Sequence, residues 1–305
     1  MEARCPFCGS SYVRTWRAPV RRFGTNDVFI VGECADCPAL ILLDPPEDPA
    51  RYYPADYPSF SIQRRTWRTP LRAVRNRLML GRHGPVARLV GRIRPHAAAR
   101  ILDRTGTTPL SRVLDVGSGA GALLGDLALA GFTSLLGVDA YIPDGIDGPG
   151  YTVIKGTLAD IDEQFDLVIF HHSLEHMRDQ RAALAGAARV LAENGWCVIR
   201  IPVFPSAAWD TYHEHWFQLE MPRHEYIHSV KSLVRLAAEA GLSFEGVEYD
   251  STAHQFAGSE GYRRGVKLRA TDRYFPRKQM REWQRQAREV NAAGRGDQAI
   301  FYFRH

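Results

Sequence analysis

Three histidines and one glutamate fall within residues 171–176, in the sequence HHSLEH, directly after the apolar run FDLVIF. An imidazole changes its charge near pH ~6.5, so His176 could remove the proton of a hydroxyl group during a transfer reaction. Histidine and glutamate side chains can also bind a divalent metal ion. A structural role is equally open, in which Glu175 and His176 pair to fix a turn between a strand and a helix.

A second group of histidines and aromatic residues occupies residues 209–228, in the sequence WDTYHEHWFQLEMPRHEYIH. Aromatic rings can stack on a sugar or a phenol while neighbouring polar groups bond to its hydroxyls. Tyr212, His215 and His224 are therefore candidate catalytic residues, with Asp210 and His213 beside them. For His215 and His224 a scaffolding role, in which the ring anchors the segment, is as consistent with the sequence as the role of a base.

Four of the five cysteines form two Cys-x-x-Cys pairs, separated by a gap of 25 residues. Two tight turns of this kind can supply four thiolates to a tetrahedral zinc ion. The short strands expected between the pairs would bury little core, so the ion would stabilise the fold. The predicted zinc ligands are Cys5, Cys8, Cys34 and Cys37. The fifth cysteine, Cys197, lies in the apolar run WCVIRI and is expected to be an inert core thiol.

A glycine-rich segment, LDVGSGAGALL, contains Asp115 and three glycines at alternate positions: Gly117, Gly119 and Gly121. Glycines permit a tight turn between a strand and a helix and let backbone approach a ligand. The pattern also fits a relaxed dinucleotide motif, but an acid at position 115 would repel a pyrophosphate and could instead accept hydrogen bonds from an ammonium group. A second acid, Asp139, ends the next apolar run and could accept both hydroxyls of a ribose.

From residue 112 onward, apolar runs alternate with helical patterns, which predicts an α/β fold with a doubly wound, Rossmann-like, mainly parallel sheet. We expect seven strands, at residues 112–117, 134–139, 151–156, 165–171, 196–202, 242–250 and 297–304. We expect helices at residues 121–131, 179–195, 231–241 and 277–292. The stretch between Asp139 and Tyr151 is too short for a helix and should be a loop. His171 and His172 then lie at the cofactor-facing edge of the sheet and are expected to be neighbours of the bound cofactor.

Length and composition suggest one sizeable domain with a small accessory module, in a chain of 305 residues that is 45% hydrophobic. We divide it into a zinc-binding module (1–45), a proline-rich linker (46–69), a basic helical segment (70–108) and an α/β domain (109–305). No apolar stretch approaches the ~20 residues of a membrane-spanning helix, and the start of the chain lacks the apolar core of a signal peptide. The sequence therefore predicts a cytoplasmic protein.

Positive charge is concentrated in residues 61–100, which contain eleven arginines and no acid, whereas the whole chain has a net charge of +5. Apolar residues at helical spacing, Leu71, Val74 and Leu78 and then Val86 to Ile93, predict two short amphipathic helices. Their basic faces could pack on the main domain. They could also contact nucleotide phosphates, a lipid surface or RNA. The arginines are Arg64, Arg65, Arg68, Arg72, Arg75, Arg77, Arg82, Arg88, Arg92, Arg94 and Arg100.

The motifs between about 112 and 250 resemble, in consistent order, the class I S-adenosylmethionine-dependent methyltransferases that carry a Leu-Glu-His signature. They are Asp115-x-Gly-x-Gly-x-Gly, Gly-Val-Asp139, FDLVIFHHSLEHM, RVLAENGWCVIRIP and EAGL. The resemblance implies that Asp115 and the three glycines form the loop around the methionine part of the cofactor and that Asp139 holds the ribose. It also implies that Thr157 and Leu158 flank the adenine, although the acid often found there is absent until Asp160.

The same resemblance bears on both histidine clusters. Some related small-molecule O-methyltransferases recruit a metal at a similar segment, which implies a possible divalent ion on His172, Glu175 and His176. Because His172 replaces a carboxylate, such an ion would be softer than magnesium. The family architecture also implies that residues near 203–228 form an insertion that caps the methyl acceptor.

A narrower resemblance covers most of the chain. The paired cysteines, RYYPADYPSF, MPRHEYIHSVKSL and DSTAHQFAGSEGYRRGVKL are similar to methyltransferases of bacterial surface-polysaccharide and secondary-metabolite biosynthesis. This resemblance implies transfer of a methyl group from S-adenosylmethionine to a small hydroxylated acceptor, such as a sugar or nucleotide-sugar. An anionic or phosphate-bearing acceptor and peripheral contact with the inner membrane face would suit the arginines.

Two other functions are weighed against this one. Some ribosomal-RNA base methyltransferases also join a zinc module to this fold, and arginine enrichment agrees with binding to nucleic acid. However, HHSLEH stands where a base-clamping Asn-Pro-Pro-Tyr motif would be expected, so nucleic acid is the less favoured partner. A zinc-module scaffold with a vestigial nucleotide domain is disfavoured because Asp115, the glycines and Asp139 are all present.

Overall fold

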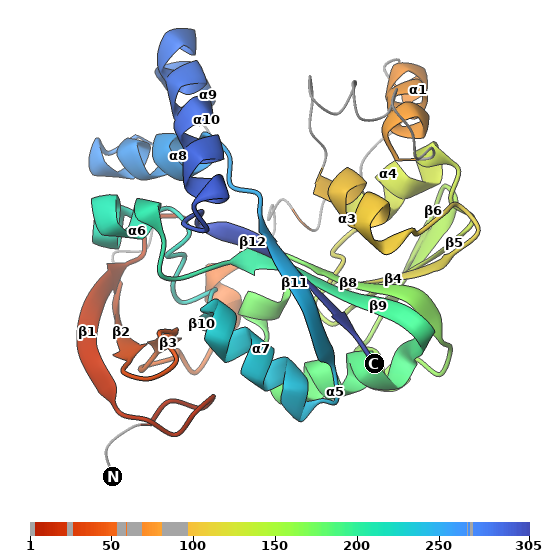
Figure 1. Cartoon of the computed structure of the whole chain (residues 1–305), viewed down its shortest axis with the longest axis horizontal. Helices are drawn as coiled ribbons and strands as arrows, with labels where there is room; N and C mark the ends of the chain where they lie inside the picture. Colours follow the sequence, from red (N-terminus) through yellow and green to blue (C-terminus); the bar gives the residue numbers. More distant parts are fainter. Residues whose placement is uncertain are drawn as a thin grey trace.

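The structure, a computed structural model, describes residues 4–22, 27–53, 59, 69–80, 97–266, 268 and 271–305 (Figure 1). Its centre is an eight-stranded sheet with the order β11-β12-β9-β8-β4-β5-β7-β6. Five neighbouring strands of this sheet run parallel: β9, β8, β4, β5 and β7. Strands β6, β11 and β12 pair antiparallel to their neighbours. The strands are β4 (Arg112–Val116), β5 (Ser134–Asp139), β6 (Ile146–Gly148), β7 (Tyr151–Lys155), β8 (Phe165–His171), β9 (Leu191–Pro202), β11 (Ser243–Tyr249) and β12 (Gln298–Arg304).

The predicted α/β class with a mainly parallel sheet is confirmed, with two differences in detail. The expected loop between Asp139 and Tyr151 contains β6, a three-residue strand that adds an eighth member at the edge of the sheet. The helix predicted for 179–195 ends at Val190, and Leu191 already begins β9. Asn194 has a φ of 65°, which is incompatible with a right-handed helix that runs on to residue 195.

Helices cover both faces of this sheet, with α1, α3 and α4 on one side and α5 and α7 on the other (Figure 1). Leu124 and Leu127 of α4 share a core with Ile101 of α3, and Leu184 of α5 shares another with Leu233 of α7. These helices are α1 (Thr69–Met79), α3 (Ala97–Thr105), α4 (Ala122–Ala130), α5 (Gln180–Val190) and α7 (Val230–Glu239). Two 3₁₀ turns follow strands of the sheet, η3 (Leu158–Asp160) after β7 and η4 (Leu174–His176) after β8.

A second, four-stranded antiparallel sheet has the order β1-β2-β3-β10. Its first three strands come from the N-terminal cysteine region, but its edge strand comes from the segment after β9, where Tyr226 pairs with Ile41. The two regions also share a core in which Trp16 packs edge-on against Trp209 at a centroid distance of 5.2 Å. The cysteine region is therefore built into the insertion. The strands are β1 (Tyr12–Pro19), β2 (Val28–Cys34), β3 (Leu40–Leu42) and β10 (Tyr226–Ile227).

The remaining helices gather beside this second sheet (Figure 1). In α6, the Ser206 side chain caps the first turn by accepting a hydrogen bond from the Trp209 backbone N–H. The long polar helix predicted for 277–292 is present as α10. The elements are η1 (Pro49–Tyr52), α6 (Ala207–Tyr212), η5 (His213–His215), α8 (His254–Arg263), α9 (Thr271–Tyr274) and α10 (Arg277–Ala292).

Helix α1 confirms the first of the two predicted basic helices, and it packs on the main domain through polar residues, which is one of the alternatives left open by the sequence. Arg72 and Asn76 bind Asp126 of α4, at 2.9 and 2.7 Å. This polar anchor turns the apolar stripe outward, and Leu71, Val74 and Leu78 are 68%, 59% and 37% exposed. The second predicted helix lies outside the described residues, as do Arg64, Arg65, Arg68, Arg82, Arg88, Arg92 and Arg94. In the described parts of the chain no helix combines the length and apolar character needed to cross a membrane.

Candidate functional site

The glycine loop lies at the carboxyl end of β4, where it leads into α4. Gly117, Gly119 and Gly121 have φ angles of 71°, 54° and 75°, which side chains other than glycine rarely adopt. A Cβ on Gly119 would lie only 2.3 Å from the carbonyl oxygen of Ser59, which accepts a hydrogen bond from the Ala120 N–H at 2.8 Å. The backbone of a linker residue therefore lies directly against the loop, at a distance that only a glycine at position 119 allows.

Asp115 and Asp139 stand on either side of this loop. Asp139 accepts hydrogen bonds from the backbone N–H groups of Gly119 and Tyr141, both at 2.8 Å. Asp115 is fully buried, and Oδ1 has no hydrogen-bond partner among the described residues. Burial, and secondarily the charge of Asp139, raises the pKa of Asp115 to about 8. A buried, unpaired carboxyl beside a glycine cradle fits a ligand that brings its own cationic group.

Thr157 and Leu158 follow β7. The Thr157 side chain accepts a hydrogen bond from the Ala159 N–H, and Asp160 bonds back to the Thr157 N–H at 2.8 Å, which forms a capping box. Leu158 is 6% exposed and packs into the core with α5. The acid at 160 therefore caps η3.

The carboxyl end of β8 brings His171, His172 and Glu175 beside Arg200 of β9. His172 has a φ of 56°, and its Nε2 accepts a hydrogen bond from Arg200 Nη1. Since that nitrogen accepts, Nδ1 carries the proton and donates to Glu175 Oε1 at 3.3 Å. His171 Nε2 lies 3.3 Å from the same guanidinium. Burial, with the Arg200 charge, lowers the pKa of His172 to about 3, so its ring is neutral.

The predicted metal set of His172, Glu175 and His176 is not brought together in that form, because both ring nitrogens of His172 are already engaged. Instead, Glu175, His176 and His224 each place one candidate ligand atom within 4.8 Å of the others. The rings of His176 and His224 are 4.7 Å apart between centroids. The turn η4 after β8, which contains Glu175 and His176, therefore contacts the insertion. This contact could not be predicted from the sequence.

Both rings of this pair are oriented by backbone carbonyls. His176 Nδ1 donates to the carbonyl oxygen of Arg223, and His224 Nδ1 donates to that of Gln218, each at 2.8 Å. The Tyr53 hydroxyl lies 3.2 Å from His176 Nδ1. Burial, then the nearby His176, lowers the pKa of His224 to about 4. His224 is therefore neutral at pH 7.

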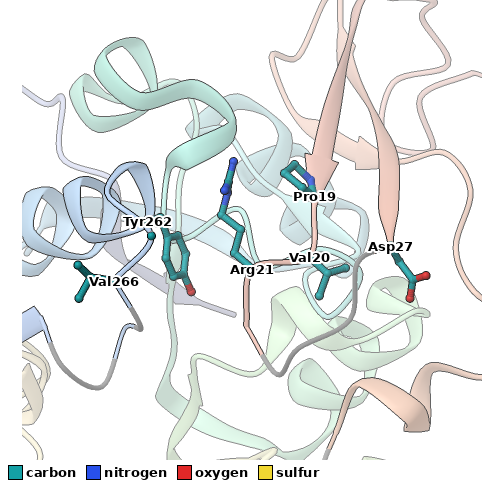
Figure 2. A pocket seen from close by; sticks show the side chains of 7 residues that line it. Pro19, Val20, Arg21, Asp27, Tyr262 and Val266 are labelled. Atoms are coloured by element: carbon teal, nitrogen blue, oxygen red, sulfur yellow. The ribbon is translucent and has the colours of Figure 1, made fainter.

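The other two predicted catalytic residues have their contacts elsewhere. The guanidinium carbon of Arg263, on α8, lies over the Tyr212 ring at 5.8 Å from its centroid. His215 lies beside Glu214, at 3.8 Å, and burial followed by the charge of Arg21 lowers its pKa. These residues lie near a cavity of about 290 Å³ between β1, β2 and α8 (Figure 2). That cavity is lined by Pro19, Val20, Arg21, Asp27, Tyr262, Gly265 and Val266.

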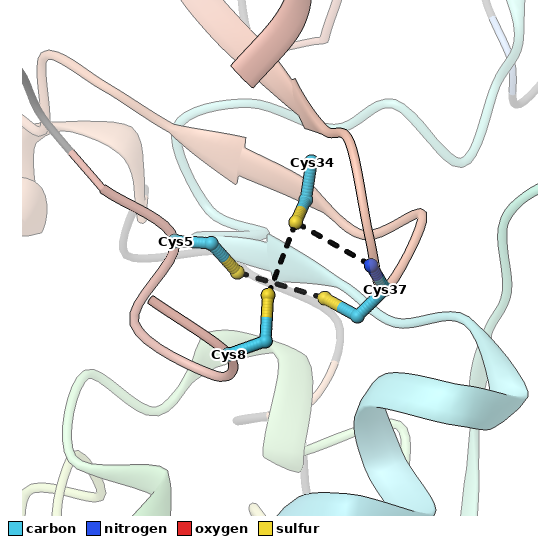
Figure 3. A group of neighbouring side chains, drawn as sticks. All are labelled: Cys5, Cys8, Cys34 and Cys37. Carbon is cyan, nitrogen blue, oxygen red and sulfur yellow. Dashed lines mark hydrogen bonds between the residues drawn. The ribbon is translucent and has the colours of Figure 1, made fainter. Parts of the chain in front are cut away.

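The four paired cysteines converge as the sequence predicts (Figure 3). The Sγ atoms of Cys5 and Cys37 are 3.6 Å apart, and those of Cys8 and Cys34 are 3.3 Å apart. None of the four is in a disulfide. Zn–S bonds of about 2.3 Å in a tetrahedron require Sγ separations of about 3.8 Å, so small shifts suffice for zinc. The fifth cysteine, Cys197, is buried in β9 as expected.

Sequence reasoning did not single out Arg200, Asp250 or Glu220. Arg200 Nε donates to Asp250 Oδ2 at 2.8 Å, and this buried pair holds His171 and His172 in place. A signal was present, because Arg200 interrupts the apolar strand CVIRIP near its carboxyl end. Burial alone would raise the pKa of Glu220, but the charges of Arg223 and Arg22 lower it to about 2.

Comparison with protein families gives one match. Residues 90–246 fit the model of a family described as a methyltransferase domain. This segment covers the glycine loop, Asp139, the HHSLEH segment and the insertion. No curated protein matches the chain by sequence.

Many solved structures resemble the chain in fold. A protein assigned as a sarcosine dimethylglycine methyltransferase from Galdieria sulphuraria is 16% identical, covers 74% of this chain and 92% of its own, and has a TM-score of 0.45. The cyclopropane synthase MmaA2 from Mycobacterium tuberculosis is 17% identical, with 68% and 84% coverage and a TM-score of 0.42. An S-adenosylmethionine-dependent methyltransferase from Mesorhizobium loti is 15% identical, with 69% and 99% coverage and a TM-score of 0.43.

Proposed function

The chain belongs to the methyltransferase domain family and is an S-adenosylmethionine-dependent methyltransferase; from this premise we propose that it methylates a hydroxyl group of a small, sugar-like acceptor. The observation that carries the proposal is the convergence of Glu175, His176 and His224 at the carboxyl edge of the sheet. Bound there, the cofactor supplies an electrophilic methyl group on a sulfonium. The protein must then align an acceptor oxygen with that methyl and help the oxygen lose its proton.

The residues around the glycine loop fit the cofactor. The orphaned carboxyl of Asp115 would receive its ammonium group, and the positive φ angles of Gly117, Gly119 and Gly121 would shape the loop around its methionine part. Asp139 keeps spare lone pairs for the ribose hydroxyls, since a carboxylate offers about four acceptor sites. Leu158, buried against α5, and Thr157, which caps η3, would position the turn beside the adenine.

The acceptor hydroxyl would be activated at the Glu175, His176 and His224 cluster. Both rings donate through Nδ1, which leaves the lone pair on Nε2 of each. His171 and His172 would line the site without acting on the acceptor proton, since Nε2 of each ring lies within hydrogen-bond distance of Arg200. Tyr212 and His215 would act at the rim of the insertion rather than on the reacting atoms.

The insertion suits a hydroxylated ring as acceptor. Phe204 and Trp216 each pack edge-on against Trp209, which makes a rigid, buried aromatic framework for the insertion. Beside His176 the partly exposed ring is that of Tyr53, whose hydroxyl lies 3.2 Å from His176 Nδ1, and aromatic faces with polar neighbours suit sugars and phenols. We place the acceptor among sugars or nucleotide-sugars because the cavity at Arg21 could take an anionic extension.

The test is transfer of label from methyl-labelled S-adenosylmethionine into fractionated bacterial extract. The proposal expects label in small polar molecules or lipid-linked sugars, and base-stable, ether-linked methyl groups on the isolated product. Label found in RNA would contradict it, and so would N-linked methyl groups. His176→Ala and His224→Ala should each reduce labelling at least ~100-fold, while the exposed His254→Gln on α8 should match wild type.

Zinc at Cys5, Cys8, Cys34 and Cys37 completes the proposal as a structural ion. The ligand shell is closed by four thiolates, as in structural rather than catalytic sites. Ser229 Oγ donates to the carbonyl oxygen of Cys37 at 2.5 Å, and Lys231 binds Asp36 at 2.6 Å. The ion would therefore hold the start of α7 and, through β3 and β10, the insertion.

We also propose that α1 rests on an anionic lipid surface. An exposed apolar stripe beside arginines is typical of helices that lie in a membrane interface. Leu71→Ser/Val74→Ser should reduce sedimentation with anionic vesicles, whereas Val13→Ser, which changes an equally exposed valine on β1, should not. Equal binding to neutral vesicles, or no binding to either kind, would contradict the proposal.

A further inference from the structure

We propose that Glu175, His176 and His224 form a second metal site, which binds one divalent transition-metal ion through two imidazoles and one carboxylate. The three candidate ligand atoms already lie within 4.8 Å of one another. They come from two segments far apart in sequence, the turn after β8 and the insertion. The site differs from the set expected from sequence, because His224 takes the place of His172.

The tautomers of both histidines suit metal binding. A backbone carbonyl oxygen can only accept, so His176 Nδ1 and His224 Nδ1 must both carry their protons. Each ring therefore presents the Nε2 lone pair. Metal-binding histidines usually donate their other N–H to a carbonyl or carboxylate, which fixes the ring and strengthens the ligand. Here both rings have this arrangement.

The carboxylate is equally well held. Glu175 is 1% exposed, and its Oε1 accepts the hydrogen bond from His172. Behind His172 stand Arg200 and Asp250, so a chain of charged and polar groups fixes the Glu175 side chain. The other oxygen, Oε2, is buried and has no hydrogen-bond partner in the described part of the chain. A buried, unpaired carboxylate oxygen is costly unless a cation meets it.

Two nitrogens and one oxygen determine the kind of ion. Imidazole favours zinc, iron, cobalt or nickel over magnesium and calcium, which prefer oxygen ligands. Three protein ligands leave coordination positions open, as in catalytic rather than structural sites. His224 is buried and His176 is partly exposed, so the open side faces the partly exposed ring.

The ion would have a definite use in methyl transfer, and this part of the inference depends on the proposed function. An acceptor hydroxyl close to a divalent ion has a lower pKa, so its proton leaves to solvent more readily. The oxygen then forms a bond to the methyl carbon while the carbon–sulfur bond breaks. The sulfonium becomes a neutral thioether, and no oxidant or reductant is needed.

The experiment must separate this ion from the one held by the cysteines. Protein is first loaded with one equivalent of zinc, which the four thiolates take, and is then titrated with cobalt(II) by calorimetry and visible absorption. Cobalt does not displace zinc readily, because it binds more weakly to the same ligands. We expect one further equivalent, without the charge-transfer absorption that thiolate ligands give.

Variants then assign the ligands. His176→Ala, which changes a partly exposed side chain, and Glu175→Gln, which keeps the side-chain shape, should each weaken cobalt binding at least ~10-fold. His254→Gln should bind as wild type does. If His176→Ala binds cobalt unchanged, or if zinc-loaded wild type binds none, the site does not exist. Thermal melts of each variant verify that it is folded.

The two proposals fail in different ways. Cobalt binding that requires all three residues, with no methylated hydroxyl product from any fraction, would overturn the acceptor assignment and leave the metal site. Methyl transfer that continues at full rate when the second ion is absent would overturn the catalytic role of the ion and leave the proposed function.

Discussion

Asp139 and Gly119 are joined by a hydrogen bond of 2.8 Å from the glycine N–H to the carboxylate Oδ2. This bond connects the end of β5 to the loop after β4, so one side chain fixes the shape of the loop. The same carboxylate is the proposed ribose ligand. Loop geometry and cofactor binding therefore depend on one residue.

Replacing Asp139 by alanine should weaken cofactor binding about 10- to 100-fold, because charge-assisted hydrogen bonds contribute about 1.5–3 kcal/mol each. Asp139→Asn keeps one acceptor oxygen and should lose less. The measurement is calorimetry with S-adenosylmethionine or its demethylated product. The control is Asp147→Ala, at a nearby exposed position in β6. Unchanged affinity in Asp139→Ala would refute the assignment.

Cofactor affinity should rise with pH through the titration of Asp115. Burial raises the pKa of this carboxyl to about 8 in the free enzyme, whereas an ammonium partner would lower it in the complex. Binding then releases a proton, so affinity increases by up to ~10-fold per pH unit below that pKa. The range from about pH 5.5 to 7 is suitable, since the cofactor's own amine remains protonated there.

Asp115→Asn provides the comparison, because it cannot release that proton. Its affinity should be weaker at pH 7 and nearly independent of pH. Calorimetry in buffers of different ionisation enthalpy counts the protons released. A flat profile in wild type, with no proton released, would contradict an ionisation of Asp115 coupled to binding.

Loss of the cysteine-bound zinc should disturb the acceptor side of the site more than the cofactor side. Cys34→Ser is expected to lose the ion and lower Tm, and through the β3–β10 pairing to loosen the segment that carries His224. KM for the acceptor should rise while cofactor affinity changes little. Cys197→Ala removes the thiol outside the cluster and should retain zinc. An equal loss of affinity for the acceptor and for the cofactor would indicate general unfolding.

Local patterns were sufficient to predict most of the central sheet. Apolar runs of five to seven residues mark β4, β5, β7 and β8, and glycines mark the turn after β4. The three-residue β6 and two-residue β10 have no comparable signal, because such short strands are determined by their partners. Tyr226 pairs with Ile41 only because the insertion folds back on the cysteine region.

The site shows the same limit. Sequence placed Glu175 and His176 in one turn and His224 in another segment, but it could not show that the two segments meet. It also suggested His172 as a ligand, whereas the positive φ of His172 turns the ring toward Arg200. For α1, helical spacing located the helix correctly. Which face is buried was decided by a polar contact with Asp126, against the apolar pattern.

Arg200 and Asp250 should be essential for the orientation of His172 and Glu175, and not only for stability. Their side chains are 12% and 6% exposed, and removing one partner of a buried pair costs about 3–5 kcal/mol. Arg200→Met alone should therefore lower stability strongly. Arg200→Met/Asp250→Asn removes both charges and keeps an acceptor for Gln298, which bonds to Asp250 at 2.8 Å, so it should recover part of that loss.

Activity should not recover with stability. Without the guanidinium, His172 Nε2 loses its hydrogen-bond donor, so the ring is held only through Nδ1 and Glu175 loses its fixed orientation beside His176 and His224. The double variant should bind the cofactor normally but show at least ~10-fold lower kcat and weaker cobalt binding. Urea unfolding, calorimetry and the labelling assay measure these three properties separately. Full turnover in a stable double variant would show that the pair only supports the fold.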